Sequence, residues 1–215
     1  MSEPALGWID PQLAEEFPKL RLWQLRVEAA DHTSPSAIRE RLRMLSDRFH
    51  GAHAIAMRRD PVPHAYRVFF RHIGIDPDGE ERTPVEAAAL ARLKHGGFKS
   101  AGLVADAVLL AVVETGVPVW ALDDDRLDGP LGIRLTGERE DLGRGPMPPP
   151  LREGRLVVAD AASPLAELFG DPAPGHGVMP ETTAIRLFTV QPGGVPAIHV
   201  EEALWTCAEC MDSVS

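Results

Sequence analysis

The sequence predicts an α+β fold formed by one domain over residues 1–215. Three observations lead to this class: helical spacing of apolar residues is concentrated before residue 116, short strand-like segments follow, and the two kinds do not alternate regularly. No internal repeat occurs at a fixed period. A chain of 215 residues, 44% of them hydrophobic, is long enough to bury the core of a single domain.

The N-terminal third predicts a strand between two helices. Asp10 and Pro11 open a short helix, because an aspartate caps the free amides and proline fits the first helical position. Residues 20–27 alternate loosely between apolar and polar side chains, which predicts a strand. Ser34 and Pro35 repeat the cap-and-proline signal ahead of a helix with apolar side chains at helical spacing.

The middle of the chain predicts three further helices. Pro63 starts one, and Thr83 with Glu86 forms a capping box at the start of another. Residues 102–115 are almost wholly apolar, so this third helix should be buried on most sides. Beyond it we expect strands at residues 117–122, 131–135, 156–159 and 185–190, a proline- and glycine-rich connection at 143–150, and a last helix at 199–210.

The charge of the chain is uneven. The formal net charge of −10 argues against a general nucleic-acid binder and against DNA as a partner. Residues 1–72 nevertheless hold 11 basic and 9 acidic side chains, whereas residues 73–215 hold 11 and 23. If RNA docks, we expect it on the arginine-rich face of the helix after Pro35, formed by Arg39, Arg41, Arg43 and Arg48.

The sequence predicts a cytoplasmic location without membrane association. No basic stretch followed by an apolar run is visible at the N-terminus. The longest apolar stretch, residues 101–113, is shorter than the ~18 to 20 residues that span a bilayer. Two cysteines do not form the disulfide framework of a secreted protein.

Motifs for cofactors and metals fail on spacing. No phosphate-binding glycine loop, nucleophile elbow or HExxH motif occurs. Residues 123–125 are all aspartate, but basic and apolar side chains follow where a calcium loop needs oxygen ligands. Cys207 and Cys210 lack two further zinc ligands, and His50 with His53 lacks a third ligand. We expect no metal and no cofactor; a metal or redox role for the two cysteines is the remaining alternative.

Two carboxylates stand out on the buried helix. Asp106 interrupts an apolar run, and burying an unpaired carboxylate costs several kcal/mol, so it should have a partner or border a cavity. Glu114 falls near the helix C-terminus, where the helix dipole disfavours a negative charge, so another group should hold it. A rotation of about 100° per residue places them about 80° apart, so they need not meet. A site role and a structural ion pair are both open.

Asp106 and Glu114 belong to a series of short motifs that follow one another along the chain in a fixed order. They are Val104-Ala105-Asp106, Glu114 to Pro118, Ala121-Leu122-Asp123, Asp125 to Gly129, the strand-like residues 154–160, Gly170-Asp171 and Thr182-Thr183. With this order, the chain resembles the tRNA-editing (B3/B4) domain of the phenylalanyl-tRNA synthetase beta subunit and its free-standing relatives. The resemblance covers about residues 10–205.

The resemblance implies a mixed β-sandwich flanked by helices, with a pocket that hydrolyses tRNA carrying the wrong amino acid. Such a deacylation needs an oriented water and donors for the developing oxyanion. It needs no covalent nucleophile, because the ester is activated. The implied partner is tRNA or aminoacyl-tRNA.

The chain departs from the family in the expected pocket. Residues 102–103 and 108–109 are small or apolar where the family has asparagine and threonine, and Trp120 stands where it has a histidine. These changes make the pocket less polar. His176 is the candidate to replace the lost donor, because a histidine transfers protons near neutral pH.

We therefore expect an editing-type domain that recognises or hydrolyses aminoacyl-tRNA or a related ester, with His176 as its catalytic residue. The residues expected to form or brace the substrate pocket are Asp106, Glu114, Trp120, Asp123 and Thr182. The alternative is a non-catalytic module that holds a small apolar ligand or a protein partner in the same pocket.

Overall fold

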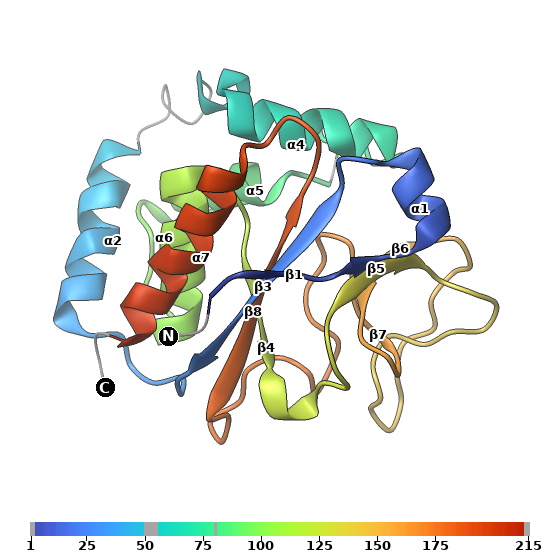
Figure 1. Ribbon diagram of the computed structural model, residues 1–215. Coiled ribbons are helices and arrows are strands. Elements are labelled where there is room, and N and C mark those ends of the chain that lie inside the picture. The colour runs from blue at the N-terminus through green and yellow to red at the C-terminus, as the bar shows by residue number, and fades with distance from the viewer. Residues whose placement is uncertain (1–2, 50–55, 80, 213–215) are drawn as a thin grey trace. The chain divides into compact units, whose positions relative to one another are not determined.

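The chain has an α+β fold, which confirms the predicted class. The computed structural model describes residues 3–49, 56–79 and 81–212 (Figure 1). They divide into two compact units. The sheet unit comprises the described part of Met1–Ala30 and Trp120–Gln191, and the helical unit comprises the described part of Asp31–Val119 and Pro192–Ser215. All described strands belong to the sheet unit.

The sheet unit contains two four-stranded sheets. Its elements are β1 (Ala5–Leu6), β2 (Trp8–Ile9), α1 (Pro11–Glu16), β3 (Arg21–Glu28), β4 (Trp120–Asp123), the 3-10 helix η2 (Asp124–Arg126), β5 (Gly132–Leu135), β6 (Leu156–Ala159), β7 (Pro164–Glu167) and β8 (Ala184–Gln191). One sheet has the order β1-β3-β8-β4 and is antiparallel. The other has the order β2-β5-β6-β7 and is mixed, because β2 and β5 run parallel.

Gly7 allows one segment to join both sheets. Its amide donates to the carbonyl of Leu22 (2.9 Å), and the next amide, of Trp8, donates to the carbonyl of Leu131 (3.1 Å). A Cβ at position 7 would lie 2.2 Å from the Leu131 carbonyl oxygen. Only glycine fits such a close backbone approach.

The antiparallel sheet is built around β3 and β8, which run side by side in Figure 1. β4 pairs with the other edge of β8, and Trp120 lies opposite Phe188. The strand expected from residue 117 begins only at Trp120. Pro118 has no amide hydrogen to donate to a ladder, which explains the late start.

The helical unit is organised around its most apolar helix. Its elements are α2 (Ser36–Arg48), the 3-10 helix η1 (Met57–Arg59), α4 (Pro61–His72), α5 (Pro84–His95), α6 (Leu103–Thr115) and α7 (Ala197–Asp212). α6 packs against α2, α5 and α7, and Figure 1 shows α6 beside α7. This packing confirms the helix and the burial predicted for residues 102–115. None of the described helices combines the length and apolar content needed to cross a membrane.

Two predicted helix caps have different outcomes. The capping box is confirmed, because the Glu86 carboxylate accepts from the Thr83 amide (3.4 Å) and hydroxyl (2.9 Å). The cap predicted at Ser34 is wrong. Pro35 occupies the cap position of α2 without a side-chain bond, and the Ser34 hydroxyl donates to Asp106 instead.

The sequence did not predict three of the strands. β1 and β2 have two residues each, too few to show an alternating pattern. β7 begins with Pro164, which normally indicates a loop. β7 lies at the edge of its sheet, where a proline is tolerated.

Candidate functional site: an arginine–histidine pocket

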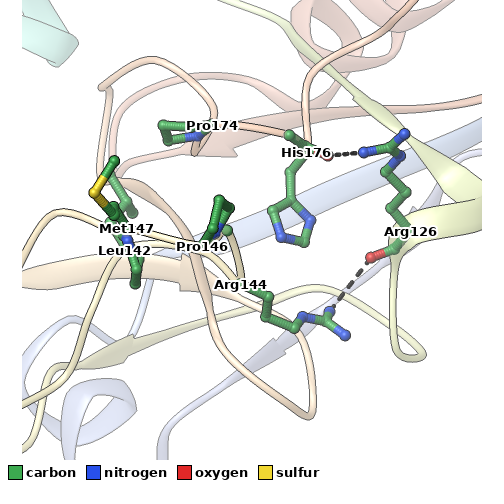
Figure 2. Close-up of a pocket in the computed structure, with 10 residues that line it drawn as sticks. Arg126, Leu142, Arg144, Pro146, Met147, Pro174 and His176 are labelled. Atoms are coloured by element: carbon green, nitrogen blue, oxygen red, sulfur yellow. Dashed lines mark hydrogen bonds between the residues drawn. The ribbon is translucent and has the colours of Figure 1, made fainter.

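A pocket of about 700 Å³ lies in the sheet unit. Arg126, Arg144 and His176 supply its titratable side chains, and none of the described lining residues is acidic. The other lining residues are Leu142, Gly145, Pro146, Met147, Pro148, Pro174 and Gly175. In Figure 2 the two arginines and the histidine gather on one side, opposite the apolar side chains. The volume falls in the range of roughly 300–1,000 Å³ usual for small-molecule sites.

His176 is held in the loop between β7 and β8 by its own backbone. Its amide donates to the Ala173 carbonyl (3.0 Å), and its carbonyl accepts from the Asp123 amide (3.0 Å). Only 5% of the residue is exposed, and Nδ1 has no hydrogen-bond partner among the described residues. A buried polar nitrogen without a partner costs about 1–3 kcal/mol, which a bound water or ligand would offset.

The surroundings of His176 favour its neutral form. Burial lowers the pKa of the imidazole from its ordinary value of 6.5, and the positive charge of Arg144 lowers it further. Asp160 and a hydrogen bond with the Arg126 backbone act in the opposite direction, but they are weaker. At neutral pH the imidazole is therefore uncharged and able to accept a proton.

Arg126 is positioned by η2 and by the loop that carries His176. Its Nη1 donates to the Gly175 carbonyl (2.8 Å), and its Nε lies 3.2 Å from the Asp123 carboxylate. Its Nη2 lies 3.4 Å from Glu181. These contacts fix the direction of the guanidinium but leave 42% of the side chain exposed.

Arg144 is positioned by a carboxylate that solvent does not reach. The side chain of Asp160 is fully buried, pairs with Arg144, and also accepts from the amides of Ala162 and Ser163 (both 2.9 Å). Arg144 further donates to the Ser163 hydroxyl (3.1 Å) and the Arg126 carbonyl (3.3 Å). Its Nη1 donates to no residue that the structure describes, so two N–H groups remain for a ligand.

Asp123 and Thr182 do not line this pocket, but Asp123 contacts Arg126, which does. The Thr182 hydroxyl donates to the Asp123 carboxylate (2.9 Å), which also accepts from the Asp125 amide (3.2 Å). The same carboxylate contacts Arg126. The structure thus brings together three residues that the sequence singled out, with His176 at the pocket and the other two supporting Arg126.

Trp120 belongs to an aromatic cluster in the same unit. Its ring stacks on Phe188 at a centroid distance of 5.6 Å and lies 6.0 Å from Phe169. It does not line the described pocket. Phe169 has a positive φ of 68°, a conformation that L side chains rarely adopt. The apolar wall expected of Trp120 remains a prediction.

Asp106 and Glu114 belong to the helical unit, on α6. Asp106 is 1% exposed and accepts from the hydroxyls of Ser34 (2.5 Å) and Ser100 (2.5 Å) and from the Ala101 amide (2.9 Å). Glu114 forms a two-pronged pair with Arg41, at 2.9 Å and 2.5 Å. Each carboxylate therefore has the polar partners expected for a buried or unfavourably placed charge. Asp106 and Glu114 have no hydrogen-bond partner in common among the described residues. Their predicted substrate role stays a prediction.

The four arginines predicted to bind RNA differ in their partners. Arg41 is taken up by Glu114, and Arg43 pairs with Glu40 and Asp47 on its own helix. Arg39 and Arg48 are exposed and form no ion pair with another described residue. Of the four guanidiniums, these two keep their full charge available to a phosphate.

Both cysteines are buried within α7, and neither takes part in a disulfide. Cys207 donates to the Ala107 carbonyl at 3.5 Å. Burial raises the pKa of Cys207 well above its ordinary value and that of Cys210 to about 11, so both are protonated at neutral pH. No group of three or more potential metal ligands occurs in the described part of the chain; His50 and His53 lie outside it.

Sequence reasoning missed Arg126 and Arg144 as lining residues of the pocket, and Asp160 as the carboxylate that holds Arg144. The usable signal was the irregular segment 143–150, where one arginine stands between two glycines. Binding residues are often carried by loops, but this signal alone does not separate Arg144 from a solvated surface arginine. The buried carboxylate that orients it comes from the end of β6, and only the fold joins the two.

Gly143 provides a direct test of the pocket. Its φ is +80°, and a Cβ there would lie 2.7 Å from Ala173 Cβ and 3.3 Å from His176 Cδ2. We expect Gly143→Ala to cost roughly 1–2 kcal/mol in thermal unfolding and to displace His176, with a loss of ligand binding. Gly154→Ala is the matched control, since φ is +75° with no atom within 4 Å. Equal effects of both variants on the pocket would contradict this role.

The fold and the site together define an α+β chain with a pocket lined by two arginines and a histidine, and sequence similarity adds a relationship. No protein-family model matches this chain. The phenylalanine–tRNA ligase beta subunit of Xylella fastidiosa (strain Temecula1) is 37% identical over 101 residues, which are 43% of this chain and 11% of that protein. Those of Xanthomonas oryzae pv. oryzae (strain MAFF 311018) and Xanthomonas campestris pv. campestris (strain 8004) are 37% and 36% identical, over 101 and 87 residues.

These matches confirm the resemblance at a coarse level. A segment of this chain is similar to part of the phenylalanine–tRNA ligase beta subunit. The matched segment spans only about a tenth of the length of those relatives (11% and 10%). Their activity as whole proteins therefore enters below only as a proposal.

Proposed function

We propose that this chain is an editing-type (B3/B4-like) domain that recognises aminoacyl-tRNA, or a related aminoacyl ester, and hydrolyses it in the pocket around His176. The observation that carries the proposal is the His176 imidazole, buried in a pocket with its Nδ1 unpartnered. The similarity to a tRNA ligase subunit supports the choice of substrate.

His176 is suited to activate water. One imidazole nitrogen is engaged by the Arg126 backbone, so Nδ1 is the nitrogen that carries the free lone pair. A water beside Nδ1 loses a proton to this nitrogen as the water oxygen attacks the ester carbonyl. When the bond between the carbonyl carbon and the ribose oxygen breaks, the same proton passes to that oxygen, which leaves as a hydroxyl. The ester is activated, so the step needs no covalent enzyme intermediate.

The arginines place positive charge close to the position where negative charge would develop during hydrolysis. The carbonyl oxygen becomes an oxyanion in the transition state, and preorganised donors stabilise it. Arg144 offers two free N–H groups at the pocket, and its position is fixed by the buried Asp160. The positive charge of Arg144 would thus have two effects: it stabilises the oxyanion, and it lowers the pKa of His176 so that the imidazole is neutral and can act as a base.

The direct test is deacylation of a panel of mischarged tRNAs by the purified full chain. We expect hydrolysis of at least one ester at a rate clearly above the spontaneous one. A protein that binds but hydrolyses none of them would favour the alternative, a non-catalytic binding module.

RNA is proposed to dock on the α2 arginines through its phosphates. We expect Arg39→Gln and Arg48→Gln each to reduce the slope of log affinity against log salt by about one, because each removes one phosphate contact. Arg43→Gln should change the slope less, since Glu40 and Asp47 already neutralise that side chain. The measurement is tRNA binding at several salt concentrations, and binding that does not weaken with salt would rule out this mode.

A further inference from the structure

We propose that the pocket is a binding site for a nucleoside phosphate, with the phosphate on Arg126 and Arg144 and the nucleoside against the apolar rim. This inference rests on the proposed function in using the same pocket, and it names the part of the substrate that the pocket holds. The chemical class is a phosphate ester, whose source is either the 3′ end of an RNA or a free mononucleotide.

Two guanidiniums converge on the pocket from separate loops. Arg126 lies at the end of η2, Arg144 lies in the loop between β5 and β6, and Arg144 donates to the Arg126 carbonyl. Their side chains are 42% and 39% exposed, so both reach the solvent in the pocket. Arginine forks match the oxygens of a phosphate in geometry and charge.

The carboxylates around these arginines lie behind them. Asp123 and Asp160 are 5% and 0% exposed at the side chain, and neither lines the pocket. Glu181 is more exposed and touches Arg126 at the long distance of 3.4 Å. The groups that face the pocket are therefore cationic or neutral, which attracts an oxyanion.

The opposite wall suits the flat, weakly polar faces of a nucleoside. Pro146, Pro148 and Pro174 are stiff and lose little entropy when a ligand binds. Met147 is 90% exposed, and a flexible thioether at the rim adapts to a ring that lies against it. The pocket of about 700 Å³ is also far larger than a single phosphate needs.

The test is isothermal titration calorimetry with the full chain and three probes: 5′-AMP, adenosine and a trinucleotide with the sequence CCA. We expect adenosine to bind at least about tenfold more weakly than AMP, because it lacks the charge-assisted bonds. The trinucleotide binding more tightly than AMP would identify an RNA end as the source, and the reverse order would identify a mononucleotide.

Variants connect this binding to the two arginines. Arg126→Gln and Arg144→Lys should each weaken AMP about tenfold; the lysine keeps a positive charge beside the buried Asp160, so the fold is preserved. Arg155→Gln is the matched control, because Arg155 pairs with Glu167 in the same unit and does not line the pocket. Thermal unfolding of each variant shows that it is folded.

Three results would overturn the inference: adenosine binding as tightly as AMP, unchanged AMP affinity in both arginine variants, or an equal loss in Arg155→Gln. The outcome is separable from the proposed function. Phosphate-dependent binding without ester hydrolysis would contradict only the hydrolase proposal. Unchanged AMP affinity in both arginine variants, while the wild-type protein hydrolyses the ester, would contradict only the phosphate site.

Discussion

Replacing His176 with asparagine is expected to lower the rate constant of aminoacyl-ester hydrolysis by roughly 10²–10⁴-fold, the usual contribution of a general base. Asparagine is close to histidine in size but has no basic nitrogen, so water loses its proton acceptor. The backbone bonds of residue 176 to Ala173 and Asp123 do not involve the side chain and should persist. The measurement is single-turnover deacylation with the ester that the wild-type protein hydrolyses fastest.

The control for this variant is another histidine of the chain. His199 is 41% exposed at its side chain and pairs with Glu202 in the helical unit. His199→Asn should therefore hydrolyse the ester at the wild-type rate. A His176→Asn protein that is folded and retains the wild-type rate would rule out the proposed base.

The pH profile gives an independent check of the same residue. The pKa of His176 is lowered from 6.5, so the basic form predominates at pH 6.5 and above and is lost as the pH falls through the lowered value. After subtraction of the spontaneous reaction, the rate should be level from neutral pH upward and fall only on the acidic side. An enzymatic rate that rises through pH 7–9 would point to a base of higher pKa.

Replacing Asp106 with alanine is expected to lower the free energy of unfolding by about 3–5 kcal/mol. The buried Ser34 hydroxyl would lose a charged acceptor, and so would the Ser100 hydroxyl and the Ala101 amide, whose bonds to the buried carboxylate are partly buried. These bonds connect the segments before α2 and before α6 to the centre of the helical unit. Chemical denaturation of the full chain measures the effect.

Glu114→Ala is the matched control on the same helix. Its pair with Arg41 is partly exposed, at 25% and 38% of the two side chains, and such pairs contribute about 0–1 kcal/mol. We expect an unfolding free energy close to that of the wild type. Equal losses in the two variants would show that burial does not separate the roles of these carboxylates.

The predictions from sequence succeeded where a local pattern determined a local structure. The apolar run at residues 102–115 could only be stable as a buried helix, and Thr83 with Glu86 satisfied each other within one turn. The prediction at Ser34 failed because a serine hydroxyl can either cap a helix or bond a distant side chain. Here the hydroxyl donates to Asp106, 72 positions away in the sequence.

The candidate site was predicted in part. His176 was singled out by its chemistry, and the structure places it in a pocket. The arginines beside it gave little local signal, because an arginine on a loop is usually a solvated surface residue. The buried acceptors that aim them, Asp160 for Arg144 and Asp123 for Arg126, come from other elements of the sheet unit.

By itself the sequence determined the α+β class, the buried helix with its two carboxylates, and the relationship to a tRNA ligase subunit. Periodicity, capping and short motifs all act between residues near one another in the chain, so they can be recognised without a fold. Only the tertiary structure decided which arginine side chains form ion pairs within the protein and which remain available to a ligand. Arg41 and Arg43 are neutralised by neighbours, whereas Arg144 keeps N–H groups that donate to no described residue, in the pocket that His176 also lines. That division depends on long-range contacts and desolvation, which no local pattern contains.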